Sequence, residues 1–293
     1  MLRLPRAVRR PTTLLALLGS TVVLAAATMA PAAADSGGAV YVNMGDSYSA
    51  GSGVLPLAAG TDIRCAQSSR NWAHDIAAAE GYRLTDVSCG GADTSDYFTP
   101  QYSGVPPQLD ALSPHTDLVT MSIGGNDNGT FSTALEDCGS LGLESLGYGS
   151  PCKDKYGDSF ANTVRTSTYD NLVKAFTAVR QAAPNARIVA ANYLWILPAT
   201  QGCFPFMPVA RGDVPYLRSL QQVLSETIEK AAAQTGVTYL DFSGVSEGHD
   251  ACQSIGTRWV EPAFGSTQFV PVHPNALGER HMADYAASQL GLG

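Results

Sequence analysis

Short apolar runs that alternate with segments of helical periodicity are the feature that most constrains the fold of this chain. β-Branched apolar runs bounded by Gly and polar residues predict strands, and apolar residues spaced by three and four predict amphipathic helices. Strands are predicted at 39–44, 83–88, 117–123, 187–193 and 237–242, and helices at 69–77, 169–179, 217–231 and 274–290. In the last helix Pro274 would take the first position. Such alternation favours an α/β fold with a parallel sheet that is covered on both faces.

The first 34 residues have the composition of a secretory signal. Four arginines lie within residues 3–10, an apolar stretch follows at 14–27, and alanines at 32–34 provide a cleavage site. The apolar stretch is too short and too rich in alanine for a membrane span. We therefore expect a signal peptide at 1–34, secretion by the general or the twin-arginine route, and one domain at 35–293.

The charge balance disfavours several classes of partner. The full chain has a net charge of −8, and four of its 18 basic residues but none of its 26 acidic residues lie in the signal segment. The mature chain therefore carries a charge of about −12. Such an acidic chain is a poor candidate for binding nucleic acid or anionic membrane surfaces. No repeat, charge run or linker divides it, and we expect a monomer without stable membrane insertion.

Six cysteines in an exported chain predict three disulfides. Six cysteines allow fifteen pairings, and their spacing alone leaves these open. A zinc site would need close Cys or His pairs, which the sequence lacks. The segments around the cysteines are predicted to be loops, so the disulfides are expected to join surface loops. The cysteines are Cys65, Cys89, Cys138, Cys152, Cys203 and Cys252.

Polar loops follow the first three predicted strands. Their sequences are Gly45-Asp46-Ser47, Gly90-Gly91-Ala92 and Gly124-Gly125-Asn126-Asp127, and His273 directly precedes the last helix. In a parallel sheet the loops after the strands emerge at one edge, which is where open α/β folds bind ligands. We therefore expect these four segments to meet.

The residue types in these loops suit acyl transfer. Acyl transfer needs a nucleophile, a base within hydrogen-bond reach and donors aimed at the developing oxyanion. Ser47 is the candidate nucleophile and His273 the candidate base, and activity would need the neutral imidazole. The candidate oxyanion donors are the N–H groups of Ser47 and Gly91 and the side-chain amide of Asn126. The alternative is that Gly91 and Asn126 serve only as turn residues.

With these four blocks in this order, the chain resembles the secreted actinobacterial lipases and esterases of the SGNH (GDSL-like) hydrolase family. The resemblance covers the mature chain, with Ser47, Gly91, Asn126 and His273 in the family's catalytic positions. It implies a three-layer α/β/α sandwich of flavodoxin type with a central, mostly parallel, five-stranded sheet, and hydrolysis of lipid esters. The cysteine spacing is also similar, which implies the sequential pairs Cys65–Cys89, Cys138–Cys152 and Cys203–Cys252.

One residue departs from the family pattern. The last block usually reads Asp-x-x-His, whereas Val270 stands here three residues before His273. Some members use a main-chain carbonyl in place of the Asp, and the carbonyl of Val270, give or take one residue, is the predicted acceptor for Nδ1–H. The prediction is therefore a Ser-His dyad.

A second serine motif competes with Ser47. The sequence Gly244-Val245-Ser246-Glu247-Gly248 matches the nucleophile elbow of α/β-hydrolases and follows a predicted strand. The elbow requires a helix directly after it and an acid and a histidine further along. The residues that follow lack a helical apolar stripe, which disfavours Ser246.

The substrate is less constrained by the sequence. The apolar residues at 194–198 and 204–207 either line an acyl-chain cleft or pack on the core. The segment rich in Gly and Ser at 137–158 is expected to be a wall or lid of the site. Carboxylesters with medium or long acyl chains, including phospholipids, are favoured by the resemblance. A carbohydrate O-acetyl esterase and an inactive secreted binding module are the alternatives. We expect no cofactor and no metal.

Overall fold

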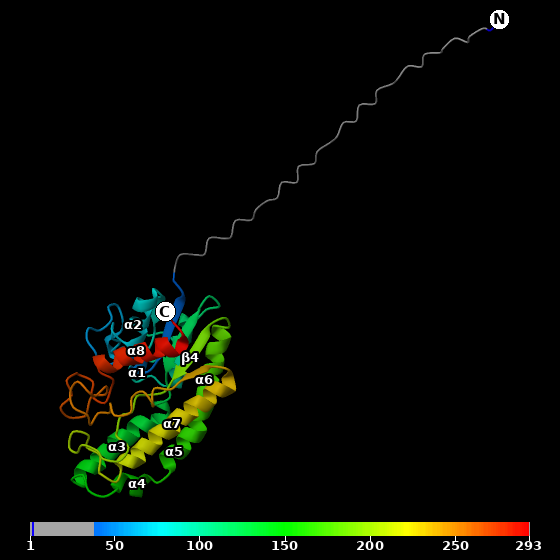
Figure 1. The fold of residues 1–293 in the computed structure, drawn as a ribbon. Helices are drawn as coiled ribbons and strands as arrows, with labels where there is room; N and C mark the ends of the chain where they lie inside the picture. Colours follow the sequence, from blue (N-terminus) through cyan, green and yellow to red (C-terminus); the bar gives the residue numbers. More distant parts are fainter. Residues whose placement is uncertain (1, 3–37, 293) are drawn as a thin grey trace. The chain divides into compact units, whose positions relative to one another are not determined.

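The structure is a computed structural model that describes residue 2 and residues 38–292. The predicted signal peptide at 1–34 therefore lies outside the described residues, apart from Leu2. Figure 1 shows the course of the chain from β1 to α8.

The five described strands form one sheet, in which every pair of neighbours is parallel. Their order is β2-β1-β3-β4-β5, which is the flavodoxin-like order. The strands are β1 (Val40–Gly45), β2 (Arg83–Asp86), β3 (Leu118–Ser122), β4 (Arg187–Ala191) and β5 (Thr238–Leu240). All five residues of β3 are buried, as expected for a central parallel strand with both faces covered. The predicted α/β fold with a five-stranded parallel sheet is confirmed.

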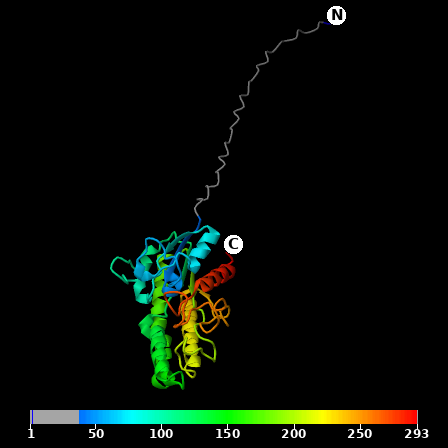
Figure 2. The ribbon, with the colours of Figure 1, turned by 90° about the vertical axis from the view of Figure 1, so that its left-hand side faces the viewer.

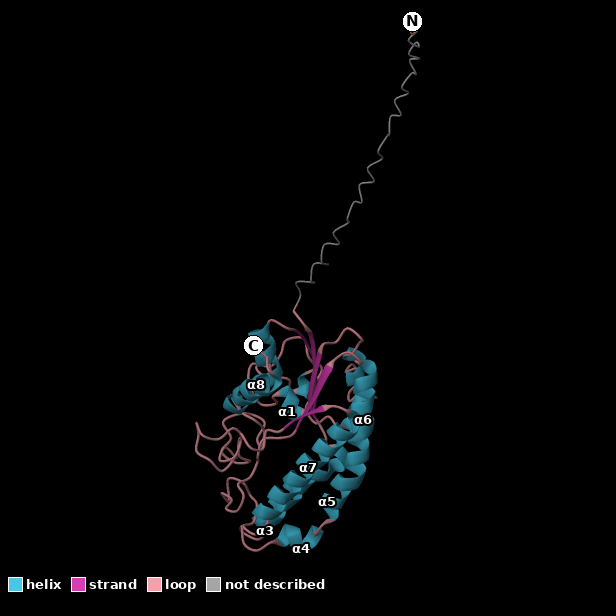
Figure 3. Cartoon of the chain, turned by 45° about the vertical axis from the view of Figure 1, so that its right-hand side comes forward, coloured by secondary structure: helices cyan, strands magenta, loops and turns pink. Residues whose placement is uncertain are grey.

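Helices cover both faces of this sheet. The α-helices are α1 (Ser47–Ala50), α2 (Trp72–Glu80), α3 (Thr130–Glu144), α4 (Pro151–Tyr156), α5 (Ser159–Thr163), α6 (Tyr169–Ala182), α7 (Val214–Thr235) and α8 (Ala276–Leu290). Shorter turns are η1 (Ile63–Cys65), η2 (Thr94–Tyr97), η3 (Gln108–Ala111), η4 (Asp127–Gly129) and the π-helical η5 (Val164–Thr168). Helix α8 lies beside α2 (Figures 1 and 2), whereas α6 and α7 pack together across the sheet from them (Figure 3).

The segment rich in Gly and Ser at 137–158 is mostly helical rather than a loop, and it contributes to a wall as expected, because Gly139, Ser140 and Leu143 line a cavity beside Ser47. It contains the end of α3 and the whole of α4. A Cβ at Gly142 would lie 2.0 Å from the carbonyl oxygen of Pro208. The glycine therefore permits close packing of a helix on the 208–210 segment, where the sequence pattern indicated a loop.

The disulfides also lie deeper than predicted. The bonds are Cys65–Cys89, Cys138–Cys152 and Cys203–Cys252, in the sequential order that the resemblance implies. Cys138 lies in α3 and Cys152 in α4, and both are fully buried. The expectation of surface-loop disulfides was wrong for this pair, because the bond joins two helices in their packed interface.

The last helix begins two residues later than predicted. Asn275 caps it, since its Oδ1 accepts hydrogen bonds from the N–H groups of Leu277 and Gly278, both at 3.0 Å. Pro274 instead forms an isolated antiparallel bridge with Val260. An asparagine side chain that satisfies two free N–H groups outweighs the preference of proline for the first helical position.

Candidate active site

Ser47 lies at the start of α1, directly after β1 ends at Gly45. The turn requires glycine, because Gly45 has φ 116° and a Cβ there would lie 2.2 Å from the carbonyl oxygen of Ser122. Asp46 caps α1 by accepting the N–H of Tyr48 at 2.9 Å. The first N–H groups of a helix have no partner within it, and among residues 38–292 the N–H of Ser47 makes no hydrogen bond, so it can serve as a donor.

His273 meets Ser47 across 226 positions of sequence. Its Nε2 lies 2.7 Å from Ser47 Oγ, which is within hydrogen-bond distance. Both residues are half-buried. Burial lowers the pKa of the His273 imidazole below its ordinary value, and a backbone hydrogen bond partly opposes that shift. The neutral ring that can accept a proton from Ser47 is therefore favoured near neutral pH.

The carbonyl that faces Nδ1 of His273 is that of Pro271, one residue after Val270 and within the margin of one residue given to that prediction. Nδ1 of His273 lies 2.8 Å from the Pro271 carbonyl oxygen. The Val270 carbonyl oxygen accepts instead from Nε2 of Gln268, at 3.0 Å. The reason is local: Val272 has a left-handed backbone, which turns the chain so that the carbonyl two residues before the histidine faces its own ring.

Asn126 reaches the same edge of the sheet from the loop after β3. Its backbone is right-handed (φ −94°, ψ −8°), so it is not the left-handed turn residue that the alternative reading required. Its Nδ2 donates to the Ala92 carbonyl at 2.9 Å, which leaves the second amide hydrogen for another acceptor. Asn126 lines one cavity together with Ser47 and His273.

Gly91 lies in a turn attached to both neighbouring loops. The N–H of Cys89 donates to the Gly45 carbonyl at 3.0 Å, and Asn126 holds the Ala92 carbonyl. Gly91 itself is exposed with φ 77°, and among residues 38–292 its N–H makes no hydrogen bond. It does not line the cavity that contains Ser47. Its role as an oxyanion donor therefore remains a prediction.

Sequence reasoning missed Tyr193, which connects two of these loops. Its Oη donates to Asp46 Oδ2 at 2.6 Å and accepts the N–H of Gly125 at 2.9 Å. Burial raises the pKa of Asp46 to about 7, although the bonds from Tyr193 and Tyr48 lower it. Its position in the sequence could have indicated this role, because Tyr193 ends the fourth predicted strand and therefore lies at the same edge of the sheet as the other loops.

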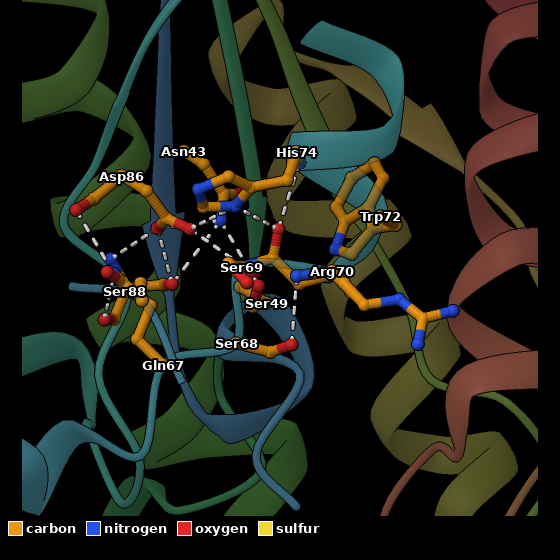
Figure 4. A network of polar contacts seen from close by, with 12 residues as sticks. Asn43, Ser49, Gln67, Ser68, Ser69, Arg70, Trp72, His74, Asp86 and Ser88 are labelled. Atoms are coloured by element: carbon orange, nitrogen blue, oxygen red, sulfur yellow. Dashed lines mark hydrogen bonds and ion pairs between the residues drawn. The ribbon is translucent and has the colours of Figure 1, made fainter. Parts of the chain in front are cut away.

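A buried polar network that includes Ser49 of α1 adjoins the turn that carries Ser47 (Figure 4). The Nδ2 of Asn43 lies 3.1 Å from the Ser49 carbonyl oxygen and 3.0 Å from Asp86 Oδ1. Asp86 also accepts from Ser88 Oγ at 2.6 Å. Burial raises the pKa of Asp86, and hydrogen bonds from Ser88 and Asn71 oppose this shift. The network links the end of α1 to β1 and to the segment after β2.

An apolar cavity of about 500 Å³ opens beside Ser47. Helix α3 forms one wall, and the 207–209 segment together with the residues before His273 completes it. Ile196 and Met207 line it, whereas Leu194 and Leu197 are buried in the core. The apolar segments at 194–198 and 204–207 were expected either to line a cleft or to pack on the core, and they do both. Other apolar lining residues are Phe131, Leu135, Leu143, Pro208, Val209, Ala263 and Val272.

Ser246 does not have the surroundings of a nucleophile. It is fully buried, and its Oγ donates to the Phe242 carbonyl at 2.8 Å and accepts the N–H of Trp195 at 3.0 Å. The nearby His249 uses Nδ1 for the Thr257 carbonyl and stacks on Trp259. The segment after Gly248 forms turns without a helix, so the elbow geometry is absent from it.

Two kinds of feature are absent from residue 2 and residues 38–292. No group of three or more His, Cys, Asp or Glu side chains in that part is arranged to hold a metal ion. Within it, no helix combines the length and the apolar character that crossing a bilayer requires.

Comparisons with known proteins agree with this geometry. A profile of the GDSL-like Lipase/Acylhydrolase family matches residues 44–281. The chain is 54% identical to Lipase 2 of Streptomyces coelicolor over 254 residues, which is 86% of each chain. Among solved structures, phospholipase A1 from Streptomyces albidoflavus NA297 superposes with a TM-score of 0.73 at 25% identity, over 86% of this chain and 99% of the other. An extracellular lipase from Streptomyces rimosus, 23% identical, shares the fold with a TM-score of 0.70 over 85% and 99% of the two chains. The chain belongs to the GDSL-like lipase/acylhydrolase family and is a carboxylic ester hydrolase.

Proposed function

We propose that the protein is a secreted lipase that cleaves carboxylesters of medium or long acyl chains, phospholipids among them, with a Ser-His dyad. The observation that carries the proposal is one hydrogen-bonded chain of groups, Ser47 Oγ to His273 to the Pro271 carbonyl, at an apolar cavity. Nucleophile, base and orienting acceptor are the three parts that acyl transfer by serine needs.

The first half of the reaction acylates Ser47. Nε2 of His273 takes the Ser47 Oγ proton as the oxygen attacks the ester carbonyl carbon. The tetrahedral oxyanion accepts hydrogen bonds from Ser47 N–H, the Asn126 amide and Gly91 N–H. His273 then gives its proton to the departing alcohol, which leaves the acyl group on Ser47. In the second half, water repeats the same steps and releases the acid.

A carbonyl in place of a carboxylate sets the properties of the base. The Pro271 carbonyl fixes the tautomer in which Nδ1 carries the proton and Nε2 faces Ser47. It stabilises the imidazolium less than a carboxylate would, because it carries no net charge. The donors around the oxyanion therefore carry more of the stabilisation of the transition state in this proposal.

The cavity supports a substrate with an apolar acyl chain. Its walls are mainly apolar, and burial of each methylene in such a site contributes about 0.8 kcal/mol. Two apolar side chains of the surrounding segments are exposed: Leu143, which lines the cavity, is 44% exposed, and Phe206, the sequence neighbour of the lining residue Met207, is 56% exposed. The names of the relatives, a lipase and a phospholipase A1, point to the same class of substrate.

The proposed secretion follows from the sequence and from the disulfides. Three disulfides form among the described residues, and such bonds persist in oxidising compartments. A carbohydrate O-acetyl esterase would need polar groups for a sugar, and the apolar walls disfavour it. An inactive binding module is disfavoured by the intact pairing of Ser47 and His273.

Rates on p-nitrophenyl esters from acetate to palmitate test the proposal, together with labelling by a fluorophosphonate. We expect the wild type to be labelled and to prefer chains longer than acetate. Ser47→Ala should abolish both labelling and hydrolysis, whereas Ser246→Ala, provided that it is folded, should still be labelled. Loss of labelling only in Ser246→Ala, with the fold intact, would refute the site, and a strong preference for acetate would refute the lipase reading.

A further inference from the structure

Val272, between the orienting carbonyl and His273, has an unusual backbone conformation. Its φ is 60°, in the left-handed region, which is disfavoured for L-residues because Cβ approaches the carbonyl oxygen, most of all when the side chain is β-branched. Rotation about the N–Cα bond of Val272 would move the Pro271 carbonyl relative to the imidazole of His273. The hydrogen bond that orients His273 therefore depends on a conformation that valine resists.

Two hydrogen bonds hold Val272 in this conformation. Its N–H donates to the Glu261 carbonyl at 3.0 Å. Its carbonyl accepts from Tyr48 Oη, also at 3.0 Å. Tyr48 is the residue directly after Ser47, so the second bond joins α1 to the chain segment that carries the base.

Tyr48 is itself fixed in place by its surroundings. The side chain is buried, and its ring packs edge-on against Tyr193 with centroids 5.0 Å apart. It also lies against the imidazole of His273, with ring centroids 5.3 Å apart. Burial raises the pKa of Tyr48 well above its ordinary value, so the hydroxyl keeps its proton and remains a donor. A single rigid side chain thus contacts the base and holds the backbone beside it.

We propose that Tyr48 is a positioning residue that holds the His273 loop, residues 270–274, against α1 and keeps Val272 in its disfavoured conformation. It takes no part in the proton transfer, and although its ring also lines the cavity, it acts through the Val272 carbonyl and the ring of His273. The inference rests on the proposed function, since it holds that Tyr48 keeps Ser47 and His273 in the geometry that the proposed reaction needs.

Tyr48→Phe tests this role because it keeps the ring and removes only the hydroxyl. On p-nitrophenyl butyrate, a short soluble ester, kcat should fall about 3- to 10-fold, the effect of one lost hydrogen bond, with KM nearly unchanged. Tyr216→Phe is the matched control, because Tyr216 Oη likewise donates to a main-chain carbonyl, that of Gly157 at 2.8 Å, and Tyr216 does not line the cavity. This control should lower the melting temperature and leave kcat unchanged. An unchanged kcat in Tyr48→Phe, or a change in KM alone, would overturn the proposal.

Val272→Gly supplies a second, independent readout. Glycine adopts a left-handed backbone readily, so a glycine at 272 does not need to be held. The fall in kcat caused by Tyr48→Phe should therefore shrink to less than about 2-fold when measured in the Val272→Gly background. An equal fall in both backgrounds would show that Tyr48 does not act through Val272.

Ser47→Ala, assayed in parallel, separates the two proposals. If Ser47→Ala still hydrolyses the ester, the proposed function fails. If Ser47→Ala is inactive and Tyr48→Phe has the kcat of the wild type, only the role of Tyr48 fails.

Discussion

A neutral group rather than a carboxylate faces Nδ1 of the proposed base, and this sets the chemistry of His273. The acceptor behind His273 is the Pro271 carbonyl, and the nearest carboxylate of the nucleophile turn, Asp46, is buried and bonded to Tyr193. Burial raises the pKa of Asp46 to about 7 and lowers the pKa of His273. With no carboxylate bonded to its Nδ1, the imidazole of His273 is neutral over a wider range of pH than an exposed histidine.

The pH dependence of hydrolysis follows from this arrangement. Only neutral His273 can accept the proton of Ser47, so kcat/KM should rise with pH through the pKa of His273 in the free enzyme. Because that pKa is lowered by burial, the midpoint of the acid limb should lie below about 6.5, the ordinary value for histidine. Rates on p-nitrophenyl butyrate between pH 4 and pH 9 provide the measurement. A midpoint above the ordinary value would mean that a negative charge stabilises the imidazolium.

Asn126 should act mainly on the transition state. Asn126→Ala removes a donor from the proposed oxyanion site, and such a loss lowers kcat by about 10²- to 10³-fold. KM should change little, because the ground-state ester carbonyl carries less charge than the oxyanion. Asn171→Ala is a suitable control. The Nδ2 of Asn171 donates a hydrogen bond to Asp127, the residue after Asn126, and Asn171 does not line the cavity. Equal losses in the two variants would indicate a structural role for Asn126.

At the scale of elements, the long connection between β3 and α6 is built around α3 and α4. Cys138 and Cys152 join these two helices, and Gly142 lets α3 approach the 208–210 segment that forms part of the cavity. Cys203 and Cys252 connect two more distant segments, with a separation of 49 residues against 14 for the first pair. The first disulfide therefore braces α3, the helix that forms one wall of the cavity.

Removal of these two disulfides should lower stability to different degrees. In the chain-entropy account, a crosslink stabilises by restricting the unfolded chain, and the effect grows with the length of the closed loop. Loss of Cys138–Cys152 by double substitution with Ala should cost about 3 kcal/mol and loss of Cys203–Cys252 about 4 kcal/mol. Urea unfolding of the wild type and the two variants measures the difference. The reverse order would show that native-state packing, such as burial of Cys138, dominates over chain entropy.

At the scale of the whole domain, residues 38–292 bring together segments that lie far apart in the sequence. Ser47 follows the first strand, α3 follows the third, and His273 precedes the last helix. Parallel strands place the loops after them at one edge, so one edge of the sheet gathers the proposed nucleophile, donors and base. The cavity wall, in contrast, comes from α3 and the 207–209 segment, outside the sheet.

A polar residue in that wall should change the preference for chain length. Leu135→Asn places an amide in the apolar cavity and should lower the ratio of palmitate to acetate hydrolysis about 10-fold, as expected for losing one buried aliphatic contact. Leu146→Asn on the same connection is the control, because Leu146 is 72% exposed, does not line the cavity and has φ 52°, which suits asparagine. Its ratio should match that of the wild type. A wild-type ratio in Leu135→Asn would place the acyl chain elsewhere.

The sequence by itself determined the strands, the helices that alternate with them and the segments that meet at the edge of the sheet. These follow from local periodicity and from the geometry of parallel strands, which act over a few residues. Only the tertiary structure decided that Pro271 rather than Val270 faces His273, that Tyr193 and Tyr48 connect the loops, and that Cys138 and Cys152 lie inside helices. These features depend on close packing between segments distant in the chain, such as Gly142 against Pro208, and no periodicity within one segment encodes such contacts.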